Sequence, residues 1–271
     1  MRPGRQVWTH RLAVLALCTV AASTEAATPD VVYEWTTVEF SWPNAATRAA
    51  YIADGRYIVA NCIVTGIKVY GSDAFVTVPR WRRGVPSTLN RVVSDGTGGH
   101  MLEPYPSWEW QQYGDHDTVP SAARRGLRYV QSMEVTPDGL MYILDVGRLH
   151  IFDDPIDGQP RLLVYDIVRD RLVSEYAFED SVASHSASFL NDLVVDQATR
   201  TVYISDTGTG ALVVFDGASK RARRYAGVST RADISLPFAV AGLPYPAVDS
   251  PADGIALSAD ATHVFFCALR G

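Results

Sequence analysis

A strand-turn-strand unit that recurs at a near-constant spacing constrains the fold of this chain more than any other feature of its sequence. The clearest copy lies in Ser188–Asp216, where the pattern predicts strands at Leu190–Asp196, Thr201–Asp206 and Ala211–Phe215. These runs are short, rich in β-branched residues and separated by polar or glycine-rich turns, so they favour strands over helices.

Three further segments repeat this pattern along the chain. They are Ile67–Trp81, Met133–Gly147 and Ile255–Gly271. One aromatic residue opens the second strand of each of the four copies, and the four residues are Phe75, Tyr142, Tyr203 and Phe265. They are 67, 61 and 62 positions apart. A repeat of this length whose unit is a small antiparallel sheet predicts an all-β fold, a β-propeller with long connecting loops.

The N-terminus has the pattern of a secretory signal peptide. Three arginines precede an apolar run, Leu12–Ala22, and small residues follow as far as Ala26. The run is much shorter than the ~20 apolar residues that a membrane span needs, and no other segment reaches that length. We therefore predict a signal peptide at 1–26, a secreted, extracellular domain at 27–271 and no membrane span.

The net charge argues against a nucleic-acid partner, and the cysteine content bears on whether a disulfide can form. The chain has a formal net charge of −6, which does not suit binding to nucleic acid. We interpret its two basic runs, Arg80–Arg83 and Lys220–Arg224, as solvated loop charge. Cys62 and Cys267 remain after the leader is removed, and an oxidising compartment would allow them to pair, although the geometry of a ring can hold them apart.

Two segments outside the repeats have readable local structure. Ala45–Ala53 fits one or two helical turns before the first repeat. Leu102–Gly114 contains two prolines and four aromatic residues, and this composition predicts an ordered loop packed over a sheet edge.

Strand direction predicts which residues line one mouth of the propeller channel. The innermost strand of a blade starts, and the second strand ends, on the same face, because the two are antiparallel. The residues at these positions are Arg80, Trp81, Gln131, Asp145, Asn191, Asp192, Asp206, Thr207 and Asp253. An acidic rim suits a cationic amine or, with an amide added, a hard metal such as calcium.

We take five of these residues as candidate ligand-binding residues. They are Asn191, Asp192, Asp145, Asp206 and Trp81, the last as a ring on which an aromatic ligand stacks. The structural alternative is that the aspartates accept hydrogen bonds from tight turns. Asn191 and Asp192 are the stronger pair, since an amide and a carboxylate that open an inner strand need partners.

Catalytic and metal signatures are absent from the sequence. The histidines show no HExxH or comparable spacing, so zinc is not expected, and there is no nucleophile elbow, P-loop or dinucleotide fingerprint. No catalytic residue is singled out, and no cofactor is predicted.

Seven phrases carry a resemblance to a known family. They are GVPSTLNRV (Gly84–Val92), LEPYPSWEW (Leu102–Trp110), LMYILDVGR (Leu140–Arg148), PRLLVYDIVRDRLVSEYAF (Pro160–Phe178), FLNDLVVD (Phe189–Asp196), VYISDTGTGALVVFD (Val202–Asp216) and DGIALSADATHVFFCAL (Asp253–Leu269). In this order, and over essentially the whole mature chain, they resemble the Yellow / major royal jelly protein family of insects.

The resemblance implies a secreted six-bladed propeller. Family members are tied to cuticle pigmentation and melanin formation, some convert dopachrome, and salivary members bind biogenic amines. This sequence stops after the second strand of its fourth repeat, so we expect about four blades of six, as in a truncated product or a fragment.

Three functions follow as alternatives. The first is a protein of the catechol and melanin pathway that acts as a dopachrome isomerase, for which an Asp or His would have to move a proton. The second is a non-catalytic binder of catechol or indole amines. The third is a calcium-dependent lactonase of the gluconolactonase type, which is also a six-bladed propeller. The sequence alone does not decide between enzyme and binder.

Overall fold

The protein is described from a computed structural model, in which the described residues are 30–112, 126–235, 239–244 and 249–268. The chain divides into a short unit, Met1–Val32, and a second unit, Tyr33–Gly271. All helices and strands given below belong to the second unit. The predicted signal peptide, residues 1–26, lies outside the described residues.

Three four-stranded antiparallel sheets form the body of the second unit, and in each the strands follow one another in chain order. The first sheet contains β1 (Ile67–Tyr70), β2 (Asp73–Thr77), β3 (Leu89–Ser94) and β4 (His100–Pro104). The second contains β5 (Val130–Val135), β6 (Leu140–Asp145), β7 (Arg161–Asp166) and β8 (Arg171–Ala177). The third contains β9 (Leu190–Asp196), β10 (Thr201–Asp206), β11 (Ala211–Asp216) and β12 (Arg221–Tyr225).

Smaller elements complete the described chain. Two strand pairs follow the third sheet, β13 (Ala239–Val240) with β14 (Leu243–Pro244) and β15 (Ala252–Leu257) with β16 (Val264–Ala268). The one α-helix among the described residues is α1 (Ala45–Ala53). Short 3₁₀ turns are η1 (Val59–Asn61), η2 (Glu109–Gln111) and η4 (Val228–Thr230).

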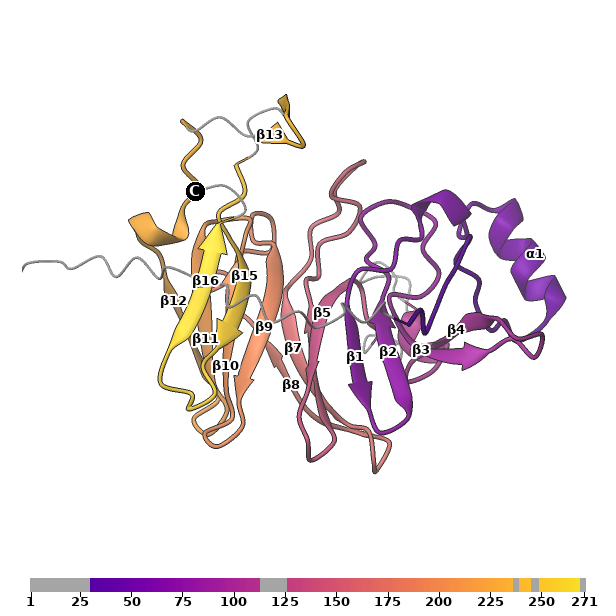
Figure 1. Cartoon of the computed structure of the whole chain (residues 1–271), viewed down its shortest axis with the longest axis horizontal. Coiled ribbons are helices and arrows are strands. Elements are labelled where there is room, and N and C mark those ends of the chain that lie inside the picture. The colour runs from indigo at the N-terminus through magenta and orange to yellow at the C-terminus, as the bar shows by residue number, and fades with distance from the viewer. Residues whose placement is uncertain (1–29, 113–125, 236–238, 245–248, 269–271) are drawn as a thin grey trace, which may run out of the picture. The chain divides into compact units, whose positions relative to one another are not determined.

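The first strands of successive sheets lie beside one another. β1 contacts β5, β5 contacts β9, and β9 contacts β15, so these strands form an inner row from which the sheets radiate (Figure 1). Apolar side chains fill the space between the sheets. Between the first and second sheets Phe75 packs near Met133 and Ile143, and between the second and third Leu144 packs near Leu193. The predicted all-β propeller architecture is therefore confirmed.

The structure confirms the strands predicted for the third sheet and the predicted helix. The strands predicted at Leu190–Asp196 and Thr201–Asp206 have these bounds in β9 and β10, and β11 extends one residue beyond the prediction to Asp216. The helix predicted at Ala45–Ala53 is α1. It is capped by Asn44, whose side chain accepts a hydrogen bond from the backbone N–H of Thr47 at 2.8 Å.

Three local interpretations were wrong. The aromatic segment predicted as a loop contributes its first residues, Leu102–Pro104, to β4, because they are in register with β3 and alternate between buried and partly exposed. The basic run Lys220–Arg224 is mostly strand β12, an outer strand whose alternate side chains are exposed. Arg80 is fully buried instead of solvated, because its guanidinium finds enough backbone acceptors to leave water.

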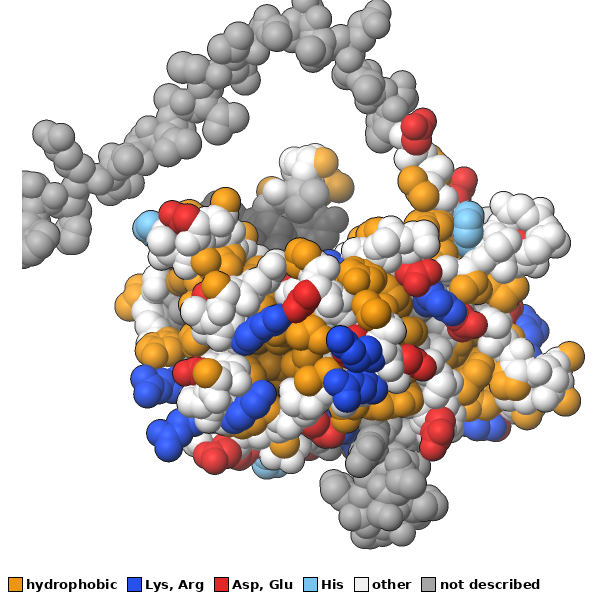
Figure 2. Space-filling view, turned by 90° about the horizontal axis from the view of Figure 1, so that it is seen from below, with side chains coloured by type: hydrophobic (Ala, Val, Ile, Leu, Met, Phe, Trp, Pro, Cys, Tyr) orange, Lys and Arg blue, Asp and Glu red, His pale blue; other side chains and the backbone are white. Residues whose placement is uncertain are grey.

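Charged side chains of both signs are interspersed with apolar ones on the face in Figure 2. Across sheets they form ion pairs such as Lys68–Glu134 and Arg200–Asp138. Cys62 is buried and Cys267 is exposed, and neither is in a disulfide. Among the described residues, no helix has the length and apolar character needed to cross a membrane.

Candidate functional site

β-Bulges at the start of three inner strands create the site. The pairing register shifts in β5 between Val130 and Ser132, in β9 opposite Ile204 and Asp206, and in β15 between Ala252 and Ile255. The inserted residues are Gln131 in β5, Asn191 and Asp192 in β9, and Asp253 and Gly254 in β15. A bulge re-aims side chains away from the regular pleat, so equivalent polar residues of three adjacent strands meet.

These bulges line a cavity of about 300 Å³, here called the acidic cavity. Its walls are Thr65–Lys68, Gln131–Met133, Asn191, Asp192, Asp253 and Gly254. The volume lies at the lower end of the range of small-molecule sites, about 300–1,000 Å³. Of the five predicted ligand-binding residues, the structure brings Asn191 and Asp192 together here.

A row of hydrogen bonds crosses the inner strands beside the cavity. Gln131 Nε2 donates to Asn191 Oδ1 at 3.0 Å, and Asn191 Nδ2 in turn donates to Asp253 Oδ1. At the other end, Gln131 Oε1 accepts from the hydroxyl of Tyr129 at 2.7 Å and from the indole Nε1 of Trp81 at 3.2 Å. An indole N–H can only donate, so Trp81 fixes the direction of the whole row and turns the Asn191 amide toward Asp253.

Asp192 lies next to this row with part of its hydrogen-bonding capacity unused. Its Oδ1 accepts from the Ser132 hydroxyl at 2.8 Å and from the backbone N–H of Leu193 at 2.9 Å. Among the described residues, all the side-chain hydrogen bonds of Asp192 fall on Oδ1, so Oδ2 is available to a ligand. Ser132 carried no signal in the sequence, since its position depends on how β5 packs against β9.

The acidic cavity is electrostatically negative. Lys68 is the one cation among its lining residues, and it is paired with Glu134 at 2.7 Å. Asp192 and Asp253 remain as two nearby carboxylates. Burial and the charge of Asp192 both raise the pKa of Asp253.

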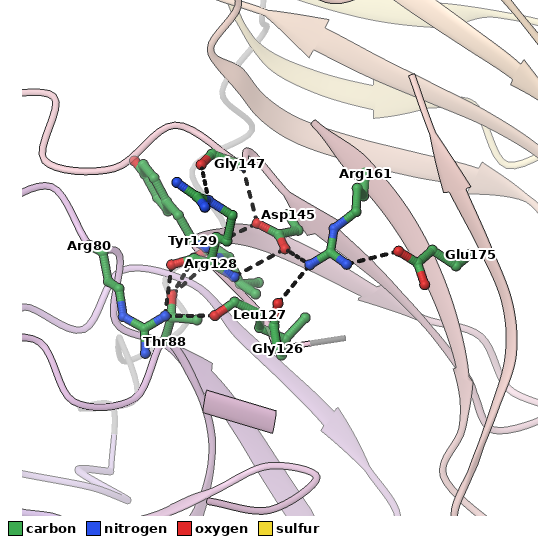
Figure 3. A network of polar contacts seen from close by, with 11 residues as sticks. Arg80, Thr88, Gly126, Leu127, Arg128, Tyr129, Asp145, Gly147, Arg161 and Glu175 are labelled. Atoms are coloured by element: carbon green, nitrogen blue, oxygen red, sulfur yellow. Dashed lines mark hydrogen bonds and ion pairs between the residues drawn. The ribbon is translucent and has the colours of Figure 1, made fainter. Parts of the chain in front are cut away.

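Asp145 is placed differently, as Figure 3 shows. It is completely buried at the end of β6, outside the lining of the acidic cavity. Its carboxylate accepts from the backbone N–H groups of Arg128 at 3.1 Å, Tyr129 at 2.9 Å and Gly147 at 3.1 Å, and it pairs with Arg161 at 2.5 Å. These contacts hold the loop that leads into β5.

Asp206 occupies the equivalent place in the third sheet. It is also completely buried, and it accepts from the Phe189 backbone N–H at 2.9 Å and from the hydroxyls of Ser188, at 2.8 Å, and Thr209. Arg224 lies 3.6 Å from its Oδ2. Both strand-end aspartates therefore have the contacts of the structural alternative, in which the carboxylate closes a turn.

Trp81 and Arg80 lie outside the lining of the acidic cavity. Trp81 packs with Tyr129 and Phe152, and does not line the cavity, so its visible role is the hydrogen bond to Gln131. The Arg80 guanidinium donates to five backbone carbonyl oxygens. Two of these acceptors, in residues 127 and 128, belong to the loop that Asp145 also holds (Figure 3).

The cavity walls provide two carboxylates and two amides. Among the described residues, no three His, Cys, Asp or Glu side chains are close enough to hold a metal ion.

Comparisons with known proteins identify relatives of this chain. The family model described as "Major royal jelly protein" matches residues 130–269. "Protein yellow" of Drosophila erecta is 32% identical over 167 residues, which is 60% of this chain and 29% of that protein. "Protein yellow" of Drosophila subobscura is 29% identical over 188 residues, 68% of this chain and 32% of that protein. The chain thus matches about a third of the length of these relatives.

Similar solved structures share little sequence with this chain. A protein of unknown function from Bacteroides caccae aligns with a TM-score of 0.41 and 8% identity over 75% of this chain and 53% of that one. Virginiamycin B lyase from Staphylococcus aureus aligns with a TM-score of 0.39 and 12% identity over 78% of this chain and 65% of that one.

Proposed function

The chain belongs to the major royal jelly protein family, and on that basis we propose that its acidic cavity binds a small aromatic amine of the catechol or indole type. The observation that carries the proposal is the pair of carboxylates, Asp192 and Asp253, in a cavity whose lysine is already neutralised by Glu134. A bound ammonium would pair with these two carboxylates.

The dimensions and the polarity of the cavity support this ligand class. A volume of about 300 Å³ accommodates one ring with a short amine chain. The amides of Gln131 and Asn191 are held in fixed orientation by the row of hydrogen bonds, so they are preorganised to contact ring hydroxyls or an indole N–H. Ser132 adds a hydroxyl at the same wall.

Calorimetric titration of the purified protein with dopamine and with tryptamine tests the proposal. Both amines are expected to bind saturably, and catechol, which has the ring without the ammonium, is expected to bind at least about tenfold more weakly, because one charge-assisted contact is worth about 1.4 kcal/mol or more. Equal affinity for catechol and dopamine would contradict the proposal, since the carboxylates would then contribute nothing.

Dopachrome conversion is a second candidate, and Asp253 is the observation that favours it. A carboxyl whose pKa is raised by burial and by a neighbouring carboxylate is suited to take a proton from one ring position and return it to another. Dopachrome decay should then be faster than the spontaneous rate, unaffected by EDTA, and lost in Asp253→Asn. Binding of amines without any such acceleration would assign the cavity to binding alone.

A place in the catechol and melanin pathway, as in cuticle pigmentation, and export from the cell belong to the same proposal. Export rests on the predicted leader at 1–26. Expression of the full chain in insect cells should deliver protein to the medium with an N-terminus near Ala27. Retention of an uncleaved chain in the cells would contradict it.

A further inference from the structure

A second and larger pocket lies beside α1, and it shares no lining residue with the acidic cavity. Its volume is about 480 Å³, within the range of small-molecule sites. The C-terminal end of α1 and the loop that follows form one wall, and the loops at Arg83–Pro86 and at Gln111, Gln112 and His150 form the other.

Two arginines and one aspartate line this pocket. Arg56 is paired with Asp54 at 2.6 Å, so these two charges cancel. Arg83 is less compensated, because its ion pair with Asp154 is long, at 3.7 Å, and the side chain of Asp154 is 90% exposed. Solvent therefore weakens this pair, and Arg83 leaves the pocket with a net positive charge.

The apolar part of the pocket suits a flat ligand. The Arg56 guanidinium lies over the ring of Tyr51, with 3.8 Å between its central carbon and the ring centroid. Planar guanidinium groups stack on aromatic rings, so the pocket already contains a flat, layered surface. Ile58 and Val85 add aliphatic walls.

His150 belongs to the same pocket wall and adds no positive charge to it. The residue is only 6% exposed. Among the described residues, its Nδ1 has no hydrogen-bond partner. Burial and the charge of Arg83 lower the pKa of this imidazole, so it is neutral near pH 7.

We propose that this pocket binds a small aromatic carboxylate, with the ring against Arg56 and the carboxylate paired with Arg83. The ligand class is opposite in charge to that of the acidic cavity. The proposal does not depend on amine binding, because the two sites use different residues.

Calorimetric titration of the full chain with benzoate tests the proposal, with a matched pair of variants. Arg83→Ala removes the cation from the pocket. Arg82→Ala removes a neighbouring exposed arginine that pairs with Asp153 and does not line the pocket. Benzoate should bind the wild type saturably, bind Arg82→Ala equally well, and bind Arg83→Ala about tenfold more weakly.

Ligand controls separate charge from shape and locate the site. Benzyl alcohol and benzylamine, which have the ring without the negative charge, should bind at least about tenfold more weakly than benzoate. Asp253→Asn should leave benzoate affinity unchanged. The proposal is overturned if folded wild type fails to bind benzoate, if Arg83→Ala and Arg82→Ala behave alike, if benzyl alcohol binds as well as benzoate, or if Asp253→Asn changes benzoate affinity.

Discussion

Four aspartates lie at the same end of the inner and second strands, but the structure divides them into two pairs. Asp192 and Asp253 are partly exposed and line the acidic cavity. Asp145 and Asp206 have no exposed surface, and their oxygens are taken by backbone N–H groups, hydroxyls and an arginine. One pair lines the cavity, and the other is enclosed by the fold.

Register within the sheet accounts for the division. Asp145 pairs with Val130, and Asp206 pairs with Leu190, so each lies opposite the first residue of an inner strand. From this position the carboxylate reaches the backbone just before that strand. The cavity aspartates lie inside the bulges, one or two residues further along, where side chains are turned toward the neighbouring inner strand. A shift of one or two positions therefore decides whether an aspartate is enclosed by the fold or lines the cavity.

Asp145→Ala should give the largest effect on stability. The substitution leaves Arg161, which is 11% exposed, without its closest carboxylate and leaves three backbone N–H groups without acceptors. Removing one partner of a buried pair typically costs about 3–5 kcal/mol. Urea unfolding should show a lower midpoint, and the unfolding free energy obtained from it should be lower by that amount.

A surface aspartate provides the comparison for this variant. Asp154→Ala changes a side chain that is 90% exposed, so its unfolding free energy should stay within about 0.5 kcal/mol of the wild type. If Asp145→Ala unfolds at the wild-type midpoint, the contacts in Figure 3 do not stabilise the loop before β5.

The double variant Asp192→Asn/Asp253→Asn should give the largest effect on binding. It preserves side-chain size but removes both negative charges of the acidic cavity. We expect the dissociation constant for dopamine to rise about tenfold for each single variant and about a hundredfold for the double, since each tenfold step corresponds to about 1.4 kcal/mol. Glu109→Gln, which removes an exposed charge outside the cavity, should leave the affinity unchanged.

Stability of the same variants sharpens the contrast with Asp145. The pKa of Asp253 is raised in the folded protein, so the charged form is less favourable folded than unfolded, and this cost applies above the folded pKa. Asp253→Asn removes the cost, and its unfolding free energy at neutral pH should equal or exceed that of the wild type. A marked loss of stability would mean that Asp253 stabilises the fold, as Asp145 and Asp206 do.

The pH dependence of amine binding reports on the same carboxylate. The ammonium stays protonated throughout the acidic range, so binding weakens as Asp253 takes up a proton. Because burial and Asp192 raise the pKa of Asp253, dopamine affinity should begin to fall at a higher pH than a solvent-exposed aspartate would give. In Asp192→Asn the fall should move to lower pH. If the pH profile of that variant is unshifted, the charge of Asp192 does not raise the pKa of Asp253.

The sequence predicted the repeat, the inner strands and the propeller architecture because each repeat carries its own strand and turn signals. It also placed Gln131, Asn191, Asp192 and Asp253 on one rim, by strand direction alone. It did not separate them from Asp145, because a bulge changes pairing without changing the pattern of apolar residues. The pocket at Arg83 was not predicted either, since it joins α1 to loops distant in sequence.

Trp81→Phe should give the smallest effect, and it tests how the site is held in shape. Phenylalanine keeps the packing against Phe152 but removes the donor that fixes the Gln131 amide. Gln131 can then turn over, and the Asn191 amide loses its defined orientation. Dopamine affinity should fall two- to threefold, a loss of about 0.5 kcal/mol, with unchanged kinetics of unfolding. Trp110→Phe, which alters an indole outside this row, should bind dopamine as the wild type does. If the two tryptophan variants behave alike, the row of hydrogen bonds does not orient the site, and the cavity aspartates act alone.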